Sequence, residues 1–267
     1  MSVSLKHLAA GILLAVIVAG CATTTSPTGR KQYVGAVSQD QLNQLGAQAF
    51  SEMKSQQPQT RSTQHRSYVT CVVNAVVREL PAQWQQTGWD VAVFESNEPN
   101  AFALPGGKVG VYTGIFQAAR NQDQLAAVIA HEIGHVIARH HDERITRQMG
   151  AAAGVQLLGA LAGDYGQLAT QGGSLLAQTR FLLPGSRAQE TESDVIGQEL
   201  MAKAGFDPRQ AVNLWQNMIA ASQSRPPQWL STHPNPQARI AELQQHAAAL
   251  VPVYEQARAA GRRPSCG

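Results

Sequence analysis

The sequence has few charged residues and no long apolar run, and both shortages narrow the classes of protein to which it can belong. Only 15% of the 267 residues are charged and 6% are aromatic, whereas 43% are hydrophobic. No apolar run reaches the roughly 18 residues that a transmembrane helix needs. The hydrophobic content is too high for a broadly disordered chain.

A strong excess of either charge is also missing. Lysine and arginine together number 21, aspartate and glutamate 18, and the net charge is +3. No segment has the concentrated basic charge of a nucleic-acid-binding arm, so we expect no nucleic-acid partner. Internal repeats are absent as well, which argues against an appended helical-repeat domain. At roughly 100–200 residues per domain, the length allows one large domain or two small ones.

The N-terminus has the pattern of a processing signal. Lys6 precedes an apolar run of 13 residues that ends at Gly20, which is too short to span a bilayer and is typical of a signal-peptide core. The run leads into Val-Ala-Gly-Cys21, which resembles a bacterial lipobox, in which the cysteine is lipidated and the chain is cut before it. A plain secretory signal is the alternative. We expect residues 1–20 to be a lipoprotein signal peptide, and residues 21–36 to be the lipidated cysteine and a tether.

Three cysteines are present in all, and lipidation of Cys21 would leave Cys71 and Cys266. Export would bring this pair into an oxidising compartment. We expect the two to form a disulfide that ties the C-terminal tail to the N-terminal helices, with two separate thiols as the alternative. In the chain-entropy model a loop of this length is worth roughly 4–5 kcal/mol.

Hydrophobic periodicity predicts helices on both sides of a short strand region. Helices are expected over residues 38–54, 68–80, 122–140, 188–204, 207–221, 236–250 and 253–260, with a further helical start over 113–120. Strands are expected over residues 91–94, 101–104 and 108–112. Asn121 and Gln124 resemble a capping box at the start of the central helix.

The clearest chemical pattern is His131-Glu132-Ile133-Gly134-His135. Histidines four residues apart lie on one face of a helix, so both can reach one Zn²⁺ at about 2.0–2.1 Å. Glu132 lies beside that face, where it can take a proton from water activated by the metal. The pattern has a chance frequency on the order of 0.01 in a chain of this composition. An ordinary charged helical face is the alternative, but the apolar neighbours argue against it.

A second acidic pattern offers a third ligand. A catalytic zinc commonly takes three protein ligands, and Glu190 and Asp194 lie four residues apart on one predicted helix face. We expect Glu190 to complete a His₂Glu site and Asp194 to fix the tautomer of a ligand histidine. Glu192 is expected to point elsewhere, into solvent. An acidic first turn that complements the helix dipole is the alternative.

Four blocks of the sequence together resemble a known family. They are residues 100–107, 131–140, 186–197 and 231–239, and they are similar to the HtpX, CAAX-prenyl-protease and BepA/LoiP group of zinc metallopeptidases. Because the sequence has neither membrane-spanning segments nor helical repeats, it is most similar to the LoiP-like branch of this group. Ser193 stands where the family usually has alanine. The N-terminal helices fit the family more loosely.

The resemblance implies roles for further residues. The strand Asn100, Ala101, Phe102, Ala103 and Leu104 is similar to the family's edge strand, which would pair with an extended substrate backbone. His233 is similar to a late histidine near the metal. It would stabilise the transition state or latch the zinc in a resting form, with a plain loop histidine as the alternative.

Arg187 and Arg239 match family positions, and a purely structural ion-pair role is equally open for both. His140 and His141 are interpreted as partners of the helix dipole at the end of the central helix. Residues 149–179, rich in alanine, glycine and leucine, are expected to be a helical hairpin on the core, or else a lid or membrane-facing segment beside the site.

The resemblance also implies the fold and the activity. We expect an α+β fold over residues 37–267: a mostly helical, zincin-like (gluzincin) domain with a small β-sheet and one Zn²⁺. The expected activity is that of a metalloendopeptidase. It would lie on an outer-membrane lipoprotein that faces the periplasm and acts in quality control of misfolded or misassembled envelope proteins. Further partners would be the outer-membrane assembly machinery or another envelope protease. The alternative is a chaperone-like assembly factor with a latched, weakly active zinc site.

Overall fold

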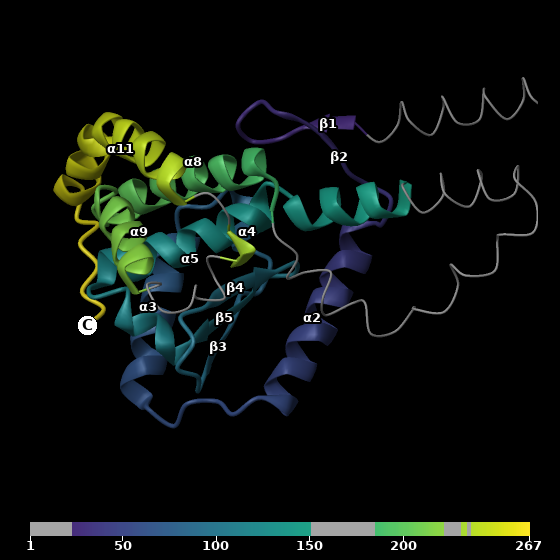
Figure 1. Ribbon diagram of the computed structural model, residues 1–267, viewed down its shortest axis with the longest axis horizontal. Helices are drawn as coiled ribbons and strands as arrows, with labels where there is room; N and C mark the ends of the chain where they lie inside the picture. Colours follow the sequence, from purple (N-terminus) through teal and green to yellow (C-terminus); the bar gives the residue numbers. More distant parts are fainter. Residues whose placement is uncertain (1–22, 151–184, 222–230, 234–235) are drawn as a thin grey trace, which may run out of the picture.

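The computed structural model describes residues 23–150, 185–221, 231–233 and 236–267 (Figure 1). The predicted signal peptide and Cys21 lie outside these ranges, as does nearly all of the glycine-rich segment 149–179. Among the residues that the structure describes, every helix is too short or too polar to cross a bilayer.

The secondary structure consists of a hairpin, a small sheet and a set of helices. The strands are β1 (Thr23–Thr25), β2 (Lys31–Tyr33), β3 (Asp90–Phe94), β4 (Ala101–Leu104) and β5 (Lys108–Tyr112). The labelled α-helices are α2 (Gln39–Gln56), α3 (Thr63–Val77), α4 (Ala82–Gln85), α5 (Gln122–Ile137), α8 (Arg187–Ala204), α9 (Gln210–Ala221) and α11 (Pro236–Ala259). Residues 140–150 are also helical, and a 3₁₀ helix covers Thr113–Gln117. The prediction of a mostly helical α+β fold with a small sheet is confirmed.

The main sheet has the order β3-β5-β4. Strand β5 runs parallel to β3 and antiparallel to β4, so the sheet is mixed and β4 forms one edge. Side chains alternate between its two faces, as the period of two requires. Ala101 and Ala103 join the core cluster of α3 and α5, whereas Phe102 and Leu104 join that of α2. The sheet therefore lies between α2 and the helix that bears the histidine pair (Figure 1).

The central helix ends earlier than the sequence predicts. Helix α5 stops at Ile137, Arg139 adopts a left-handed φ of 56°, and residues 140–150 form a new helix. His140 and His141 therefore begin a helix and are buried, so the interpretation as dipole partners at the end of α5 is wrong. The cap of α5 also differs from a full capping box. Asn121 Oδ1 accepts the N–H of Gln124, but Gln124 Oε1 accepts from Arg120.

Several other elements also differ from the predictions. Helix α3 begins at Thr63 because the Ser62 side chain caps it by accepting the N–H of His65. Helix α11 continues through Pro252 as a single helix, where the proline was expected to separate two. Residues 23–36, expected to be a tether, include the antiparallel β1–β2 hairpin, which docks on the domain.

Candidate zinc site

The histidine pair lies in the C-terminal half of α5, which is buried along nearly its whole length. Its flanking residues pack against the sheet on one side and against α8 on the other. Neighbouring glycines allow the two helices to approach closely. A Cβ atom at Gly134 would lie 3.1 Å from the carbonyl oxygen of Ser193, and one at Gly197 would lie 3.0 Å from the backbone nitrogen of His131. The close crossing brings the acidic turn of α8 next to the histidines.

Four side chains converge at this crossing: His131, His135, Glu190 and His233. One ligand atom from each lies within 4.8 Å of the others, and all four residues are buried. The Nε2 atoms of the two helix histidines are 3.1 Å apart. Glu190 Oε2 lies 3.4 Å from His131 Nε2, and Glu190 Oε1 lies 3.6 Å from His135 Nε2. The cluster has the nitrogen and oxygen donors of a His₂Glu zinc site.

The buried carboxylate of Glu190 supports a metal ion at this position. Its Oε1 atom is buried without a hydrogen-bond partner in the part of the chain that the structure describes. An unsatisfied buried carboxylate oxygen is costly unless a cation balances it. Burial raises the pKa of Glu190, but His233 and His135 outweigh it and hold the pKa well below its usual range. Burial lowers the pKa of His135 well below its usual range. The donor set fits Zn²⁺.

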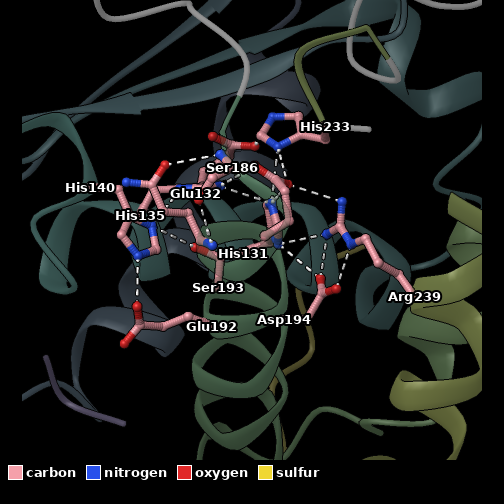
Figure 2. Close-up of polar contacts among 12 residues, drawn as sticks. His131, Glu132, His135, His140, Ser186, Glu192, Ser193, Asp194, His233 and Arg239 are labelled. Carbon is pink, nitrogen blue, oxygen red and sulfur yellow. Dashed lines mark hydrogen bonds and ion pairs between the residues drawn. The ribbon is translucent and has the colours of Figure 1, made fainter. Parts of the chain in front are cut away.

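Asp194 and Arg239 support the other histidine. Asp194 Oδ1 lies 3.0 Å from His131 Nδ1 and 2.6 Å from Arg239 Nη2 (Figure 2). A carboxylate at Nδ1 accepts a hydrogen bond from the ring N–H there, so that the lone pair of Nε2 points toward the cluster. Burial raises the pKa of Asp194, but the Arg239 guanidinium outweighs it, so the pKa is lowered. Asp194 remains a carboxylate, as its expected role requires.

His233 reaches into the cluster from the C-terminal part of the chain (Figure 2). Its Nδ1 atom lies 2.9 Å from Glu190 Oε2 and its Nε2 atom 3.2 Å from Glu132 Oε1. Burial lowers its pKa, but Glu190 and Glu132 outweigh it and raise the pKa to about 9. His233 is thus buried against both the proposed base and the proposed third ligand.

The expectation that Glu192 is solvated is wrong. Its side chain is buried, and Oε2 lies 3.0 Å from His140 Nε2 (Figure 2). Thr28 and Arg30 of the N-terminal hairpin also donate to it. No sequence signal marked these contacts, because the hairpin and Glu192 are more than 160 residues apart.

The predicted substrate strand lies at the sheet edge, next to α5. Residues 101–104 form β4, which pairs on one side with β5. These residues are buried as a whole, backbone included, with 1–4% of their surface exposed. Asn100 is also buried, and its Oδ1 atom accepts the N–H of Ala101.

The structure joins Cys71 on α3 to Cys266 in the C-terminal tail as a disulfide, with Cα atoms 5.5 Å apart. The tail also contacts the start of α5. The N–H of Cys266 donates to Gln122 Oε1, and Gln122 Nε2 donates to the carbonyl of Pro264. The tail therefore lies at the end of α5 opposite the histidine pair.

A buried HExxH helix with a facing glutamate defines a metallopeptidase that uses zinc. Residues 63–247 match the sequence pattern of Peptidase family M48. Mitochondrial metalloendopeptidase OMA1 of Schizosaccharomyces pombe is 34% identical over 223 residues, 82% of this chain and 65% of its own. The beta-barrel assembly-enhancing protease of Escherichia coli K12 is 31% identical over 179 residues, 64% of this chain and 37% of its own.

The chain belongs to peptidase family M48. The resemblance read from the sequence blocks is thereby confirmed. The chain spans less than two thirds of the length of either relative.

Proposed function

We propose that the protein is a zinc-dependent endopeptidase of the bacterial envelope. The observation that carries the proposal is the buried convergence of His131, His135 and Glu190 on one point, with Glu132 beside it. His131, His135 and Glu190 would hold the metal. Bound zinc would supply Lewis acidity, which polarises the substrate carbonyl and makes water a better nucleophile near neutral pH.

Glu132 would carry the proton. Its carboxylate lies on the active-site helix next to the ligand histidines, in a buried setting. It would accept a proton from the attacking water and deliver it to the leaving amine, so that one group serves as base and then as acid. Because Glu132 already lies 3.2 Å from His233 Nε2, that histidine could stabilise the oxyanion that forms on the substrate.

The edge strand would bind the substrate through its backbone. Strand β4, with Asn100 before it, would pair with an extended peptide by strand addition. The buried side chains of residues 101–104 would contribute little to the choice of sequence. Such recognition suits substrates that are extended because they are misfolded or misassembled.

The envelope location is proposed from the N-terminal sequence and from one relative. Residues 1–20 would be a lipoprotein signal peptide, Cys21 the lipidated residue, and residues 37–267 the metallopeptidase domain in the periplasm, anchored to the outer membrane. The name of the Escherichia coli relative, a beta-barrel assembly-enhancing protease, supports envelope proteins as substrates and the assembly machinery as a partner. Another envelope protease is a further candidate partner.

Zinc content and casein cleavage test the proposal directly, with Glu132→Gln beside the wild type. The glutamine keeps the size of the side chain but cannot accept the proton. We expect one zinc per chain in both proteins and cleavage only in the wild type. A folded wild type without zinc would contradict the metal site, and full cleavage by Glu132→Gln would contradict the role of Glu132.

The lipid anchor has its own test. With Cys21→Ser, we expect the protein to leave the outer-membrane fraction and to keep its zinc. An unchanged distribution between fractions would contradict lipidation without affecting the metallopeptidase proposal.

A chaperone-like function with a latched site is the second candidate, and the position of His233 favours it. The ring contacts both Glu132 and Glu190, where it would exclude substrate. His233→Ala distinguishes the two roles of this residue. Faster casein cleavage would identify a latch, and loss of cleavage with zinc retained would identify transition-state stabilisation.

A further inference from the structure

The N-terminal hairpin contacts two helices next to the zinc site, α8 and the helix of residues 140–150. Strands β1 and β2 lie beside α8 and the helix of residues 140–150 (Figure 1). Beyond the hairpin, the N–H of Gly35 donates to Asp142 Oδ1 and the N–H of Ala36 donates to Thr146 Oγ1. A segment expected to be a loose tether is therefore held by specific contacts.

Arg30 makes the central contact. Its Nη2 and Nη1 atoms donate to the two carboxylate oxygens of Glu143, at 2.8 and 3.0 Å, and its Nε donates to Glu192 Oε2 at 2.7 Å. The side chains of Glu143 and Glu192 are 0% and 2% exposed. Buried carboxylates need a partner that balances their charge. The planar fork of a guanidinium can bind one carboxylate through two nitrogens and a second through its third, a geometry that the single nitrogen of a lysine cannot reproduce.

Glu192 connects Arg30 to the side chains around the metal ligands. Thr28 Oγ1 donates to its Oε1 at 2.6 Å, and its Oε2 lies 3.0 Å from His140 Nε2. His140 Nδ1 then lies 2.7 Å from His135 Nδ1 (Figure 2). Both rings are buried. Four side chains thus form a continuous path from the hairpin to one of the two helix histidines.

The Glu192 carboxylate determines which atom donates in each hydrogen bond along this path. The carboxylate of Glu192 can only accept, so His140 Nε2 carries a proton and donates it. A neutral imidazole has a single ring proton, so Nδ1 of the buried His140 ring is an acceptor. His135 Nδ1 must then be the donor in the contact between the rings. The Nε2 lone pair of His135 consequently points to the cluster, as a metal ligand requires.

We propose that Thr28 and Arg30 of the N-terminal hairpin are positioning residues for the metal centre, which act on His135 through Glu192 and His140. The inference rests on the proposed role of His135 as a zinc ligand. It gives the hairpin a part in building the site: when the hairpin is docked, Glu192 is fixed, His140 is oriented by it, and His135 is held in the tautomer that binds metal.

Zinc affinity of the purified full chain tests the proposal, measured by competition with a chelator. Thr28→Val removes one donor to Glu192 and keeps the shape of the side chain. Thr191→Val is the matched control, because its hydroxyl donates to the exposed Glu242 instead. We expect zinc affinity to fall about threefold in Thr28→Val and to stay unchanged in Thr191→Val. Equal affinities in the wild type and Thr28→Val would overturn the proposal.

Arg30→Ala should lower zinc affinity more than Thr28→Val does. His140→Asn tests whether this effect passes through His140. We expect the arginine variant to lose on the order of tenfold in zinc affinity and to change the visible absorption of the cobalt-substituted protein. Arg30→Lys should recover part of the loss. In the His140→Asn background, Arg30→Ala should cause little further loss, because the path is already broken there.

Two outcomes would count against the proposal. One concerns the path from Arg30 through Glu192 and His140 to His135, and the other concerns the metal site itself. If Arg30→Ala weakens zinc binding equally with and without His140→Asn, its effect does not pass through His140. The hairpin would then only stabilise the fold, and the proposed path would be wrong. If the wild type binds no zinc, the proposed metal site fails instead. Thr28→Val keeps the test available should Arg30→Ala not fold.

Discussion

At the scale of a single residue, Arg239 is one of the cations that balance the negative charge of the site. Its side chain is 1% exposed and donates to Asp194 at 2.6 Å from both Nε and Nη2 and to Glu190 Oε2 at 3.0 Å from Nη1. Its guanidinium carbon also lies 4.0 Å above the Trp215 ring. Two buried carboxylates share this one cation. Arg239 therefore has the structural ion-pair role that the sequence left open, whether or not it also acts near the substrate.

Arg239→Leu should destabilise the fold by about 3–5 kcal/mol, because it leaves the buried Asp194 carboxylate without its guanidinium partner. Urea unfolding measures this loss. Lys203→Ala is the control: its ion pair with Glu199 is exposed and should contribute no more than about 1 kcal/mol. Equal unfolding midpoints for Arg239→Leu and the wild type would contradict the proposed charge balance.

The crossing of α5 and α8 is the decisive contact at the scale of the elements. Small residues line it, with Gly134 facing Ser193 and Gly197 facing His131. The close approach brings the histidines of one helix to the carboxylates of the other. Serine in place of the family's usual alanine at position 193 leaves this approach possible, because both side chains are small.

Gly197→Val should push α8 away from α5. A Cβ at this position already lies 3.0 Å from backbone, so the larger side chain should cost about 1–3 kcal/mol of stability. Zinc affinity should fall as well, because Glu190 moves with α8. Gly150→Val is the matched control, since a Cβ there meets no atom of the described residues within 4 Å. Unchanged zinc affinity in a folded Gly197→Val protein would contradict this view of the crossing.

The disulfide and the C-terminal tail act at the scale of the whole molecule. The bond between Cys71 and Cys266 joins residues 195 positions apart. The tail that it holds also contacts Gln122 at the start of α5, and Arg262 forms an ion pair with Glu79. These contacts fasten the two ends of the domain together, away from the metal ligands.

Replacing both cysteines by alanine, Cys71→Ala with Cys266→Ala, should lower the free energy of unfolding by up to roughly 5 kcal/mol. Zinc content and casein cleavage of the folded protein should not change, because the disulfide does not contact the site. Denaturant unfolding and zinc analysis of the same sample measure both quantities. Loss of zinc from the folded variant would mean that the tail also positions α5 for metal binding.

The sequence by itself determined what depends on short spacings. Two histidines four residues apart share a helix face wherever the helix lies, so the HExxH pattern predicted their convergence. The same holds for Glu190 and Asp194. The strands of the main sheet followed from alternation along the chain, and each of these three is found within a residue of its prediction.

The tertiary structure decided what depends on long separations. Glu192 meets Arg30 across 162 residues and His140 across 52, and no local pattern marks a buried carboxylate whose partner is so distant. Packing also overrode local signals. Helix α11 packs on α8 and α9 and continues through Pro252, although proline usually ends a helix. Spacing along the chain determines which face a side chain takes, whereas the packed fold determines what that face meets.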